Sequence, residues 1–531
     1  MSRGPARTIG VVGAGTMGAG IAQLACQAAG ARTLLHDPEP DALRRGIETI
    51  QSHLKRGVDR GRLSQDDADQ AQDRLEALDS LEGLDSCDLV IEAAPESVPL
   101  KRELFESLSG TVGEECVLAT NTSSLSVTAL ASAASPPERV VGMHFFNPAP
   151  IMGLLEVVAG EQSGDDAVAL ARATGEAMGK RVILASDGPG FLVNRCARPF
   201  GLEALHLLQE RLAPIEQIDR VCRMGGGFRM GPFELMDLVG VDTGLSVSES
   251  FYEQSFGEPR WRPSPIAARM TAAGRHGRKS GRGYYDYGSD RHRPEDPDPP
   301  SAGGGSGRLV VAGDLVVAEQ LRAAAAGAGY EVVEGLEPPF ETPWLIVDCS
   351  AGEHPLPLEG GPQALLCAEG ALGQLDPAGT AAGFHALPPL DDSRLVELTR
   401  TPSTSPVAAE RTERLFQTLG KQVEWVGDAP ALVLGRIVCQ LVNEAAFALT
   451  EEVGSAEDID AGVVLGLNYP RGTLSWADGI GLDHVLGVLD ALQEHYREER
   501  YRAAPLLRAH VWEGRLGRHA GAGFFDYDND E

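Results

Sequence analysis

The stretch TIGVVGAGTMGAGIAQLACQAAG, residues 8–30, joins a short β-rich run to a helix through a cluster of glycines. TIGVV is apolar and β-branched, as expected of a buried strand. Gly13, Gly15 and Gly18 then follow in the spacing G-x-G-x-x-G. In this context the glycines permit a tight turn and let backbone N–H groups approach a pyrophosphate, whose charge the helix N-terminus stabilises. The stretch therefore predicts the first strand, turn and helix of a dinucleotide-binding α/β domain.

An acidic residue at the end of the next expected strand strengthens this prediction. ARTLLHD (31–37) ends on Asp37, 24 residues after Gly13, where a carboxylate can bind a ribose 2′-hydroxyl. Glu39 adds negative charge that would repel a 2′-phosphate, so we expect NAD rather than NADP. The alternative is an ordinary glycine-rich turn between strand and helix, which gives Asp37 no role.

Strands and helices continue to alternate after this point, which predicts an α/β domain with a mostly parallel sheet. Residues 86–94 and 116–124 each contain a further expected strand. Residues 39–78 carry two polar helical stretches, the second opening at Ser64 with acidic residues in its first turn. The expected domains of this half are a Rossmann-like NAD-binding domain with that helical arm, residues 1–187, and an all-α domain, residues 188–288.

The chain then repeats itself after a linker. Residues 289–307 are rich in Pro, Gly, Ser and charge, with nothing to bury. GRHGRKSGRGYYDY (274–287) returns as RLGRHAGAGFFDY (515–527), and upstream of it acidic residues recur at a constant offset of 241. We therefore expect a tandem duplication, with a degenerate Rossmann-like domain over residues 308–428 and a second helical domain over residues 429–531.

The net charge limits the kinds of partner. Lys and Arg number 46 against 77 Asp and Glu, a formal charge of −31, which argues against nucleic acid and an anionic membrane surface. No run of 18 apolar residues occurs, so no membrane span is expected. Eight cysteines are scattered without a CxxC pair. We therefore expect a reduced, cytoplasmic protein with no metal cluster and no disulfide framework.

One histidine and one glutamate stand twelve positions apart in an apolar segment, GMHFFNPAPIMGLLEVV (142–158). His144 precedes a proline turn, and Glu156 lies in LLEVV, which is typical of a strand. The pair fits a catalytic base with its orienting carboxylate. The alternative is a buried polar pair that only satisfies itself, which is the commoner situation for buried His and Glu. This segment alone leaves both interpretations open.

Six motifs, taken in order, resemble those of the L-3-hydroxyacyl-CoA dehydrogenase family. They are GAGTMGAGIA, VIEAAPESVPLK, NTSSLSVT, HFFNPAP with LLEVV, GPGFLVNR and GRKSGRGYYDY, and they extend over nearly all of residues 8–287. The tandem second half resembles the long bacterial form of the family, such as the 3-hydroxyadipyl-CoA or 3-hydroxybutyryl-CoA dehydrogenases of phenylacetate catabolism. The resemblance implies NAD as cofactor, an acyl-CoA as substrate, and a place in fatty acid β-oxidation or aromatic catabolism.

The resemblance also implies roles for individual residues. His144 would be the general acid/base and Glu156 its orienting partner, while Ser123 and Asn194 would contact the reacting oxygen of the substrate. The implied cofactor contacts are Gly13, Gly15, Met17, Gly18, Asp37, Glu96, Lys101, Asn147 and Lys279. Without the family these residues have ordinary alternatives, namely a helix cap for Ser123, helix-end polarity for Asn194, a solvated charge pair for Glu96 with Lys101, and a surface lysine for Lys279.

The residues that bind CoA are less clearly marked. The arm carries a local basic group, Lys55 and Arg56 followed by Arg60 and Arg62, which is suited to the 3′-phosphate of CoA. A solvated helix–turn–helix explains the same pattern equally well.

The function that these motifs favour is the NAD-dependent oxidation of an L-3-hydroxyacyl-CoA to a 3-oxoacyl-CoA. One alternative is a related NAD-dependent dehydrogenase of a small hydroxy or sugar acid, which would share the His–Glu pair. Another is a non-catalytic protein that binds acyl-CoA or NAD, which would require a broken motif. Activity with a CoA thioester but not with the free acid separates the first two.

The second copy is expected to lack a second active site. It keeps the pair as His385 and Glu397, which we expect to be buried and mutually satisfied. RLVVAGDLVVAEQ (308–320) has no G-x-G-x-x-G, and the residues that would match the arm are missing. Gly435 stands where Asn194 would, and His519 where Lys279 would. The two helical domains are expected to pack on each other as an internal pseudo-dimer, and a further homodimer stays open.

Overall fold

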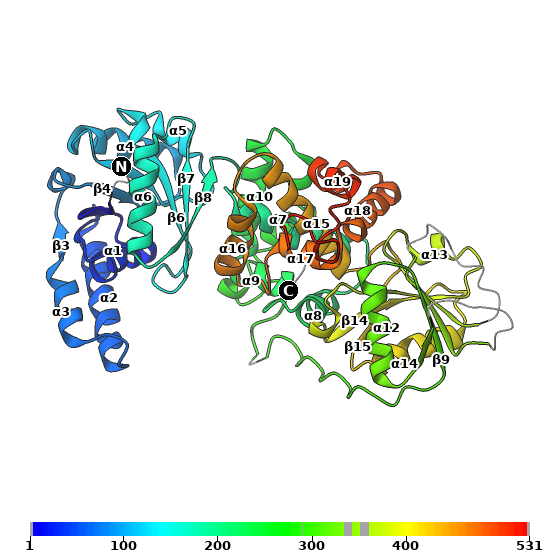
Figure 1. Ribbon diagram of the computed structural model, residues 1–531. Helices are drawn as coiled ribbons and strands as arrows, with labels where there is room; N and C mark the ends of the chain where they lie inside the picture. The colour runs from blue at the N-terminus through cyan, green and yellow to red at the C-terminus, as the bar shows by residue number, and fades with distance from the viewer. Residues whose placement is uncertain (1–3, 290, 334–341, 351–360, 528–531) are drawn as a thin grey trace. The chain divides into compact units, whose positions relative to one another are not determined.

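The computed structural model describes residues 4–289, 291–333, 342–350 and 361–527, which divide into two compact units (Figure 1). The first unit contains residues 1–195 together with 452–467. The second unit contains residues 196–451 together with 468–531. Each unit is built around one twisted sheet. Among the described residues, no helix combines the length and the apolar character needed to cross a bilayer.

The sheet of the first unit has eight strands in the order β3-β2-β1-β4-β5-β6-β7-β8. The strands are β1 (Thr8–Val12), β2 (Arg32–His36), β3 (Leu75–Leu78), β4 (Leu89–Glu92), β5 (Val117–Thr120), β6 (Val140–Phe145), β7 (Leu154–Ala159) and β8 (Arg181–Ser186). All neighbours are parallel except β6 and β7, which are antiparallel. Because β1 lies between β2 and β4, the strand order reverses beside it, where open α/β sheets bind their ligands. The predicted α/β class is confirmed.

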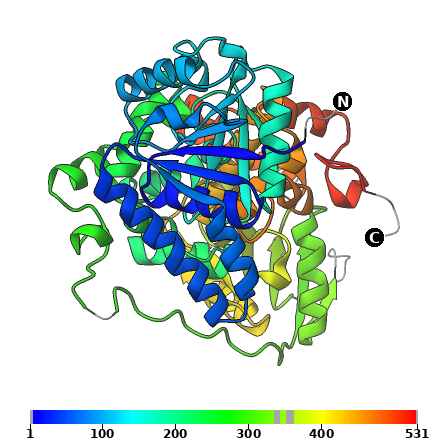
Figure 2. The same cartoon turned by 90° about the vertical axis from the view of Figure 1, so that its left-hand side faces the viewer.

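The helices of this unit include the arm that the sequence predicts. They are α1 (Thr16–Gln27), α2 (Pro40–Asp59), α3 (Gln65–Asp73), α4 (Val98–Thr111), α5 (Val127–Ala131) and α6 (Asp165–Ala177). Helices α2 and α3 lie side by side in both views (Figures 1 and 2). The hydroxyl of Ser64 caps α3 by accepting the N–H of Asp67 at 3.0 Å. The arm ends in strand β3 where the sequence predicted only helix, because Leu75 onward pairs with β2.

Within the described residues, the sheet of the second unit repeats the first with one strand fewer, in the order β10-β9-β11-β12-β13-β14-β15. Its strands are β9 (Arg308–Ala312), β10 (Glu331–Val333), β11 (Leu345–Asp348), β12 (Gln363–Leu366), β13 (Ala382–His385), β14 (Leu395–Thr399) and β15 (Gln422–Trp425), and its helices are α12 (Val316–Ala328), α13 (Leu372–Leu375) and α14 (Pro406–Thr418). Of the strand pairs that the structure describes here, again only β13 with β14 is antiparallel. No counterpart of α2, α3 or β3 occurs among the described residues of this copy.

Two sets of helices follow the two sheets. The first set is α7 (Val193–Gln209), α8 (Ile215–Arg220), α9 (Pro232–Val239), α10 (Val241–Gln254) and α11 (Pro265–Ala272), and the second is α15 (Leu434–Thr450), α16 (Ala456–Leu467), α17 (Thr473–Ile480), α18 (Leu482–Tyr496) and α19 (Pro505–Trp512). Asp237 on α9 accepts the N–H groups of Tyr284 and Tyr285, and Asp478 on α17 accepts those of Phe524 and Phe525. The same fastening in both sets supports the duplication.

Helix α16 departs from the domain plan that the sequence suggests. The sequence assigns it to a single helical domain over residues 429–531, but it belongs to the first unit, where it packs on β7 and β8. Asp458 on α16 accepts the backbone N–H of Leu184 at 3.2 Å and pairs with Arg181 at 3.3 Å. The second copy therefore contributes a helix to the unit that contains the first sheet.

The linker is also more tightly held than its composition predicts. Asp296 forms a two-pronged ion pair with the guanidinium of Arg223, at 2.6 and 2.9 Å. The carboxylate of Glu234 pairs with Arg293 and with His292, both at 2.8 Å. The composition predicts a linker with nothing to bury, but its charged residues pair with the buried Arg223, which follows α8, and with the buried Glu234 on α9.

Candidate active site

His144 and Glu156 face each other across the antiparallel strands β6 and β7, in direct register. Their side chains are joined by a hydrogen bond of 2.6 Å between Nδ1 of His144 and Oε2 of Glu156. Both are buried, with Glu156 fully enclosed. The other carboxylate oxygen, Oε1, accepts the backbone N–H groups of Leu192 at 3.1 Å and Val193 at 2.9 Å. The start of α7 therefore holds the carboxylate, and the carboxylate holds the ring.

Ser123 lies on the opposite side of the ring. Its Oγ is 2.9 Å from Nε2 of His144, and the residue is exposed. Since Glu156 accepts from Nδ1, the proton of the neutral ring is on Nδ1, and Nε2 is available to exchange a proton with an external group. The arrangement is a hydrogen-bonded chain, Ser123–His144–Glu156, that opens toward solvent at Ser123. Such a chain suits general acid/base chemistry on a bound hydroxyl or carbonyl group.

Two aromatic rings and one amide fix the position of the histidine. The ring of Phe146 lies 4.6 Å from that of His144 between centroids, and the ring of Phe191 lies at 5.8 Å. Asn121 accepts the backbone N–H of Phe145 at 2.9 Å, which ties the loop after β5 to the end of β6. Sequence reasoning missed Asn121, although it directly precedes the TSS motif at a strand end.

The glycine-rich turn has the geometry of a pyrophosphate site. Gly13 has φ of +101°, and a Cβ there would lie 2.6 Å from the carbonyl oxygen of Ala93. A Cβ on Gly18 would lie 1.7 Å from the carbonyl oxygen of Gly13, so both positions exclude a side chain. At Gly15, the N-cap of α1, the same test meets open space, and no side chain caps the helix. The backbone at the helix N-terminus is therefore accessible to an anionic group, which fits NAD.

The carboxylate of Asp37 is fastened beside this turn. One oxygen accepts the N–H of Ala14 at 2.8 Å, and the other accepts the N–H of Glu39 at 2.9 Å. Asp37 is only half-buried, and each carboxylate oxygen can accept a further hydrogen bond, such as one from a ribose hydroxyl. Met17 is half-buried on the first turn of α1.

Lys101 and Glu96 belong to a charge cluster that is buried at Lys101 and exposed at Glu96, rather than to a fully solvated pair. The ammonium of Lys101, which is 1% exposed, donates to both oxygens of Glu92 at 2.8 and 2.9 Å and lies 3.2 Å from Glu96. Glu96 also accepts the hydroxyls of Thr122 and Ser124. Although burial opposes it, the charge of Lys101 together with these hydroxyls lowers the pKa of Glu96. Glu92, at the end of β4, is the member of the cluster that sequence reasoning missed.

The remaining predicted residues do not all gather at the histidine. Asn194 lies half-buried on the first turn of α7, directly after Val193. Asn147 is exposed after β6, and Lys55 and Arg56 are exposed on α2. Lys279 lies in the second unit, where its ammonium pairs with Asp242 at 2.7 Å.

The corresponding histidine of the second copy has a different environment. His385 and Glu397 are in register on β13 and β14, yet among the described residues no hydrogen bond joins their side chains, so the expected mutually satisfied pair is wrong. Nδ1 of His385 is buried without a partner, and its Nε2 lies 3.3 Å from Nε2 of His484. The reason is Gly435: a Cβ there would lie 2.1 Å from the ring of His385, which occupies the space that a side chain would fill.

Burial keeps these groups uncharged. It raises the pKa of Glu397 to about 8, an effect only partly offset by the N–H groups of Leu434 and Val433. It lowers the pKa of His484 to about 4. Burial and the neighbouring His484 together hold the pKa of His385 well below its ordinary value. A neutral carboxyl beside neutral imidazoles avoids an unpaired charge in this core.

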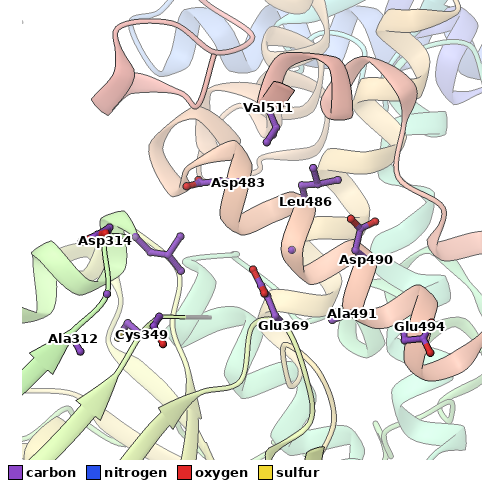
Figure 3. A pocket seen from close by; sticks show the side chains of 14 residues that line it. Ala312, Asp314, Cys349, Glu369, Asp483, Leu486, Asp490, Ala491, Glu494 and Val511 are labelled. Atoms are coloured by element: carbon purple, nitrogen blue, oxygen red, sulfur yellow. The ribbon is translucent and has the colours of Figure 1, made fainter. Parts of the chain in front are cut away.

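The turn after β9 is also altered. Gly313 keeps the positive φ of Gly13, at +106°, but Leu315 stands at the N-cap of α12 where Gly15 stands in α1. A cavity of about 790 Å³ lies beside this turn. Its lining includes five carboxylates and, among the described residues, no lysine or arginine; Figure 3 shows Asp314, Glu369, Asp483, Asp490 and Glu494 around it. A space with this charge disfavours a pyrophosphate.

A Rossmann-type sheet with an open glycine turn and an internal His–Glu pair is the arrangement of a dinucleotide-dependent dehydrogenase. The family model of the 3-hydroxyacyl-CoA dehydrogenase NAD-binding domain matches residues 8–188, and that of the 3-hydroxyacyl-CoA dehydrogenase C-terminal domain matches residues 190–287 and again 432–527. The chain belongs to the 3-hydroxyacyl-CoA dehydrogenase family, a family of NAD-dependent oxidoreductases.

Known relatives share most of the chain. The 3-hydroxyadipyl-CoA dehydrogenase of Escherichia coli (strain K12) is 34% identical over 504 residues, which cover 94% of this chain and 97% of that protein. A crystal structure of 3-hydroxybutyryl-CoA dehydrogenase from E. coli K12 has a TM-score of 0.82 at 33% identity, covering 96% of this chain and 98% of that one. A probable 3-hydroxybutyryl-CoA dehydrogenase of Deinococcus radiodurans is 40% identical over 278 residues, 52% of this chain and 99% of that protein.

Proposed function

We propose that this protein oxidises an L-3-hydroxyacyl-CoA to the 3-oxoacyl-CoA, and catalyses the reverse reaction, with His144 as general acid/base and Glu156 as its orienting partner. The observation that carries the proposal is the Ser123–His144–Glu156 chain, in which the carboxylate is 2.6 Å from Nδ1 and the serine hydroxyl 2.9 Å from Nε2. It lies in a unit whose glycine turn fits NAD.

Oxidation of a secondary alcohol requires a proton and a hydride to leave together. NAD, when bound, supplies the nicotinamide ring that accepts the hydride. Nε2 of His144 removes the hydroxyl proton, and the resulting imidazolium is stabilised by Glu156 through Nδ1. Ser123 and Asn194 position the reacting oxygen. In the reverse direction, Nε2 returns its proton to the developing alkoxide.

The cofactor-binding residues of the proposal are those expected from the sequence, apart from Lys279 and Lys101. Gly13, Gly15, Met17, Gly18, Asp37, Glu96 and Asn147 would hold NAD, whereas Lys279 belongs to the second unit and stays a prediction from the sequence. Lys101 would act behind Glu96, because its ammonium is fully internal and engaged by two carboxylates. It would fix the position of Glu96 rather than reach the cofactor itself.

The substrate would be a short acyl chain, either 3-hydroxybutyryl-CoA or 3-hydroxyadipyl-CoA, in aromatic or fatty acid catabolism. Support comes from the activities for which the relatives above are named. Lys55 and Arg56, exposed on α2, would meet a phosphate of CoA. The test is the specificity constant for a panel of 3-hydroxyacyl-CoA esters, including the dicarboxylic one, beside the free acids. Turnover of a free hydroxy acid at a rate comparable to its CoA ester would contradict the proposal.

The second copy would carry no active site and would serve as the partner of the first. Glu203 on α7 pairs with Arg436 on α15 and, at 3.5 Å, with Arg500, while Glu444 on α15 pairs with Arg260 at 2.9 Å. The glutamate of each copy thus binds an arginine of the other, which is the self-complementary pattern of a two-fold interface. This reciprocity supports an internal pseudo-dimer of the helical sets.

A further inference from the structure

Helix α16 of the second copy lies against the segments that carry the histidine and the glutamate of the first. Three glycines make this contact close. A Cβ on Gly454, just before the helix, would lie 2.6 Å from Leu192, one on Gly462 would lie 2.7 Å from Val193, and one on Gly466 would lie 3.2 Å from Phe146. All of these residues belong to the first unit.

Leu192, Val193 and Phe146 each contact a member of the His–Glu pair directly. Leu192 and Val193 donate the two backbone hydrogen bonds to Oε1 of Glu156. Phe146 lies with its ring 4.6 Å from that of His144. The helix therefore touches both supports of the carboxylate and the aromatic support of the imidazole.

The helix is anchored on both sides of this contact. Before it, the carbonyl of Val453 accepts the N–H of Ser186, at 3.0 Å, at the end of β8. Within its first turn, Asp458 accepts the N–H of Leu184 at 3.2 Å. Further along, a Cβ on Gly466 would also lie 2.8 Å from Leu154, which is fully buried on β7 two residues before Glu156. These hydrogen bonds thus fix the position of α16 along β8, and the glycines set the distance between the helix and the segments that hold His144 and Glu156.

We propose that α16 of the degenerate copy is a positioning element of the active site, with Gly466 and Gly462 as positioning residues that fix the geometry of His144 and Glu156 through Phe146 and Val193. The proposal rests on the proposed role of His144 as the base. It gives the second copy a use in catalysis although it binds no substrate. A proton-transferring chain must be held within a few tenths of an ångström, and interiors packed at crystal density transmit small displacements.

The chain provides a matched control in the opposite half. Gly225 stands 241 positions before Gly466, and a Cβ there would lie 3.2 Å from Leu434 and 3.4 Å from the carbonyl of Leu395. Leu395 and Leu434 are the counterparts of Leu154 and Val193 at the same offset. A substitution at Gly225 therefore inserts the same group at the same kind of contact, but beside His385 and Glu397.

The experiment compares Gly466→Val with Gly225→Val in the full chain. We expect the first to lower kcat at least 10-fold, to shift the acidic limb of the kcat/KM pH profile, and to leave the KM for NAD within about 2-fold. We expect the second to leave all three within about 2-fold of the unmodified protein, whatever it does to thermal stability. If the valine variant does not fold, Gly466→Ala adds a single methyl group and has better helix propensity than glycine.

Unchanged kcat and pH profile in both Gly466 variants would overturn the positioning role. So would equal losses in the Gly466 and Gly225 variants, because they would indicate general destabilisation. His144→Gln is measured in parallel: if it loses kcat while Gly466→Val does not, the positioning role fails and the proposed base stands. If His144→Gln itself keeps kcat, it is the proposed function that fails.

Discussion

At the scale of single residues, the histidine and glutamate are hydrogen-bonded in the first copy but not in the second, because one neighbouring residue differs. With Asn194 at the start of α7, His144 bonds to Glu156; with Gly435 in that place, His385 turns to His484. The sequence displays the glycine, but the direction of the ring depends on space that only the packed structure defines. For this reason the sequence predicted a satisfied pair in the second copy and was wrong.

Replacing the proposed base separates the two copies by function. His144→Gln removes the group that exchanges the proton and should lower kcat by roughly 10²–10⁴-fold while NAD binding persists. His385→Gln is the control and should leave kcat within a few-fold. Steady-state kinetics of the two variants, with NAD affinity measured separately, check this. A near-normal kcat in the His144 variant would make that histidine structural.

Glu397 predicts a pH dependence of stability with a definite sign. Its folded pKa, about 8, is above the ordinary carboxyl value of 4.5, so between these values the folded protein holds a proton that the unfolded chain has released. Stability from this group is therefore present at low pH and is lost as the pH rises toward 8. From pH 6.5 to 8, the unfolding free energy of the natural protein relative to Glu397→Gln should fall by on the order of 1–2 kcal/mol.

The window above pH 6.5 is chosen because of the histidines. The pKa of His484, about 4, lies below the ordinary imidazole value of 6.5. Its contribution to the free energy of unfolding therefore has the opposite sign, and it changes with pH only below 6.5. Denaturant titrations of both proteins at several pH values provide the free energies. A difference that stays constant across the window would mean that Glu397 is ionised in the folded state.

At the scale of elements, local patterns predicted the strands and helices that surround the site. The runs around residues 8–12, 31–37, 86–94 and 116–124 form β1, β2, β4 and β5, because buried parallel strands have short continuous apolar sequences. The pairing of β3 with β2 and the packing of α16 on the first unit were not predictable, since both depend on contacts far apart in sequence. Lys101 with Glu96 was misleading for a different reason: the main partner of Lys101 is Glu92, nine residues earlier at the end of β4, and the local sequence does not show that both side chains are buried.

The pairing of α7 with α15 predicts a strong stability effect. Arg436 is fully buried and binds Glu203 and Glu210, and although burial opposes it, Arg436 lowers the pKa of Glu203 to about 2. Arg436→Met should destabilise the protein by about 3–5 kcal/mol, because it leaves a buried carboxylate without its main partner. Denaturant unfolding measures the change. Arg44→Met, which breaks an exposed pair with Asp41, is the control and should cost less than about 1 kcal/mol.

At the scale of the whole molecule, the two copies differ in the features that the proposed site requires. Apart from β3, the two sheets have the same strand order, yet among the described residues only the first is accompanied by the arm, the open glycine turn and the bonded His–Glu pair. The second copy has an acidic cavity where a pyrophosphate would bind, and it contributes α16 to the first unit. The loss of the second site, expected from its missing glycines, stays a prediction, whereas the structural contribution of α16 could not be predicted from the sequence.

The number of NAD sites per chain, measured by isothermal titration calorimetry, tests most directly whether only the first copy binds the cofactor and the second copy has a structural role. One NAD should bind per chain, and Gly15→Val, which places a branched side chain at the open turn, should abolish binding. Leu315→Gly is the matched change in the second copy and should leave the count at one, because the acidic cavity beside it still disfavours a pyrophosphate. Two NAD per chain in the natural protein, or one that persists in the Gly15 variant, would contradict the proposed roles of the two copies.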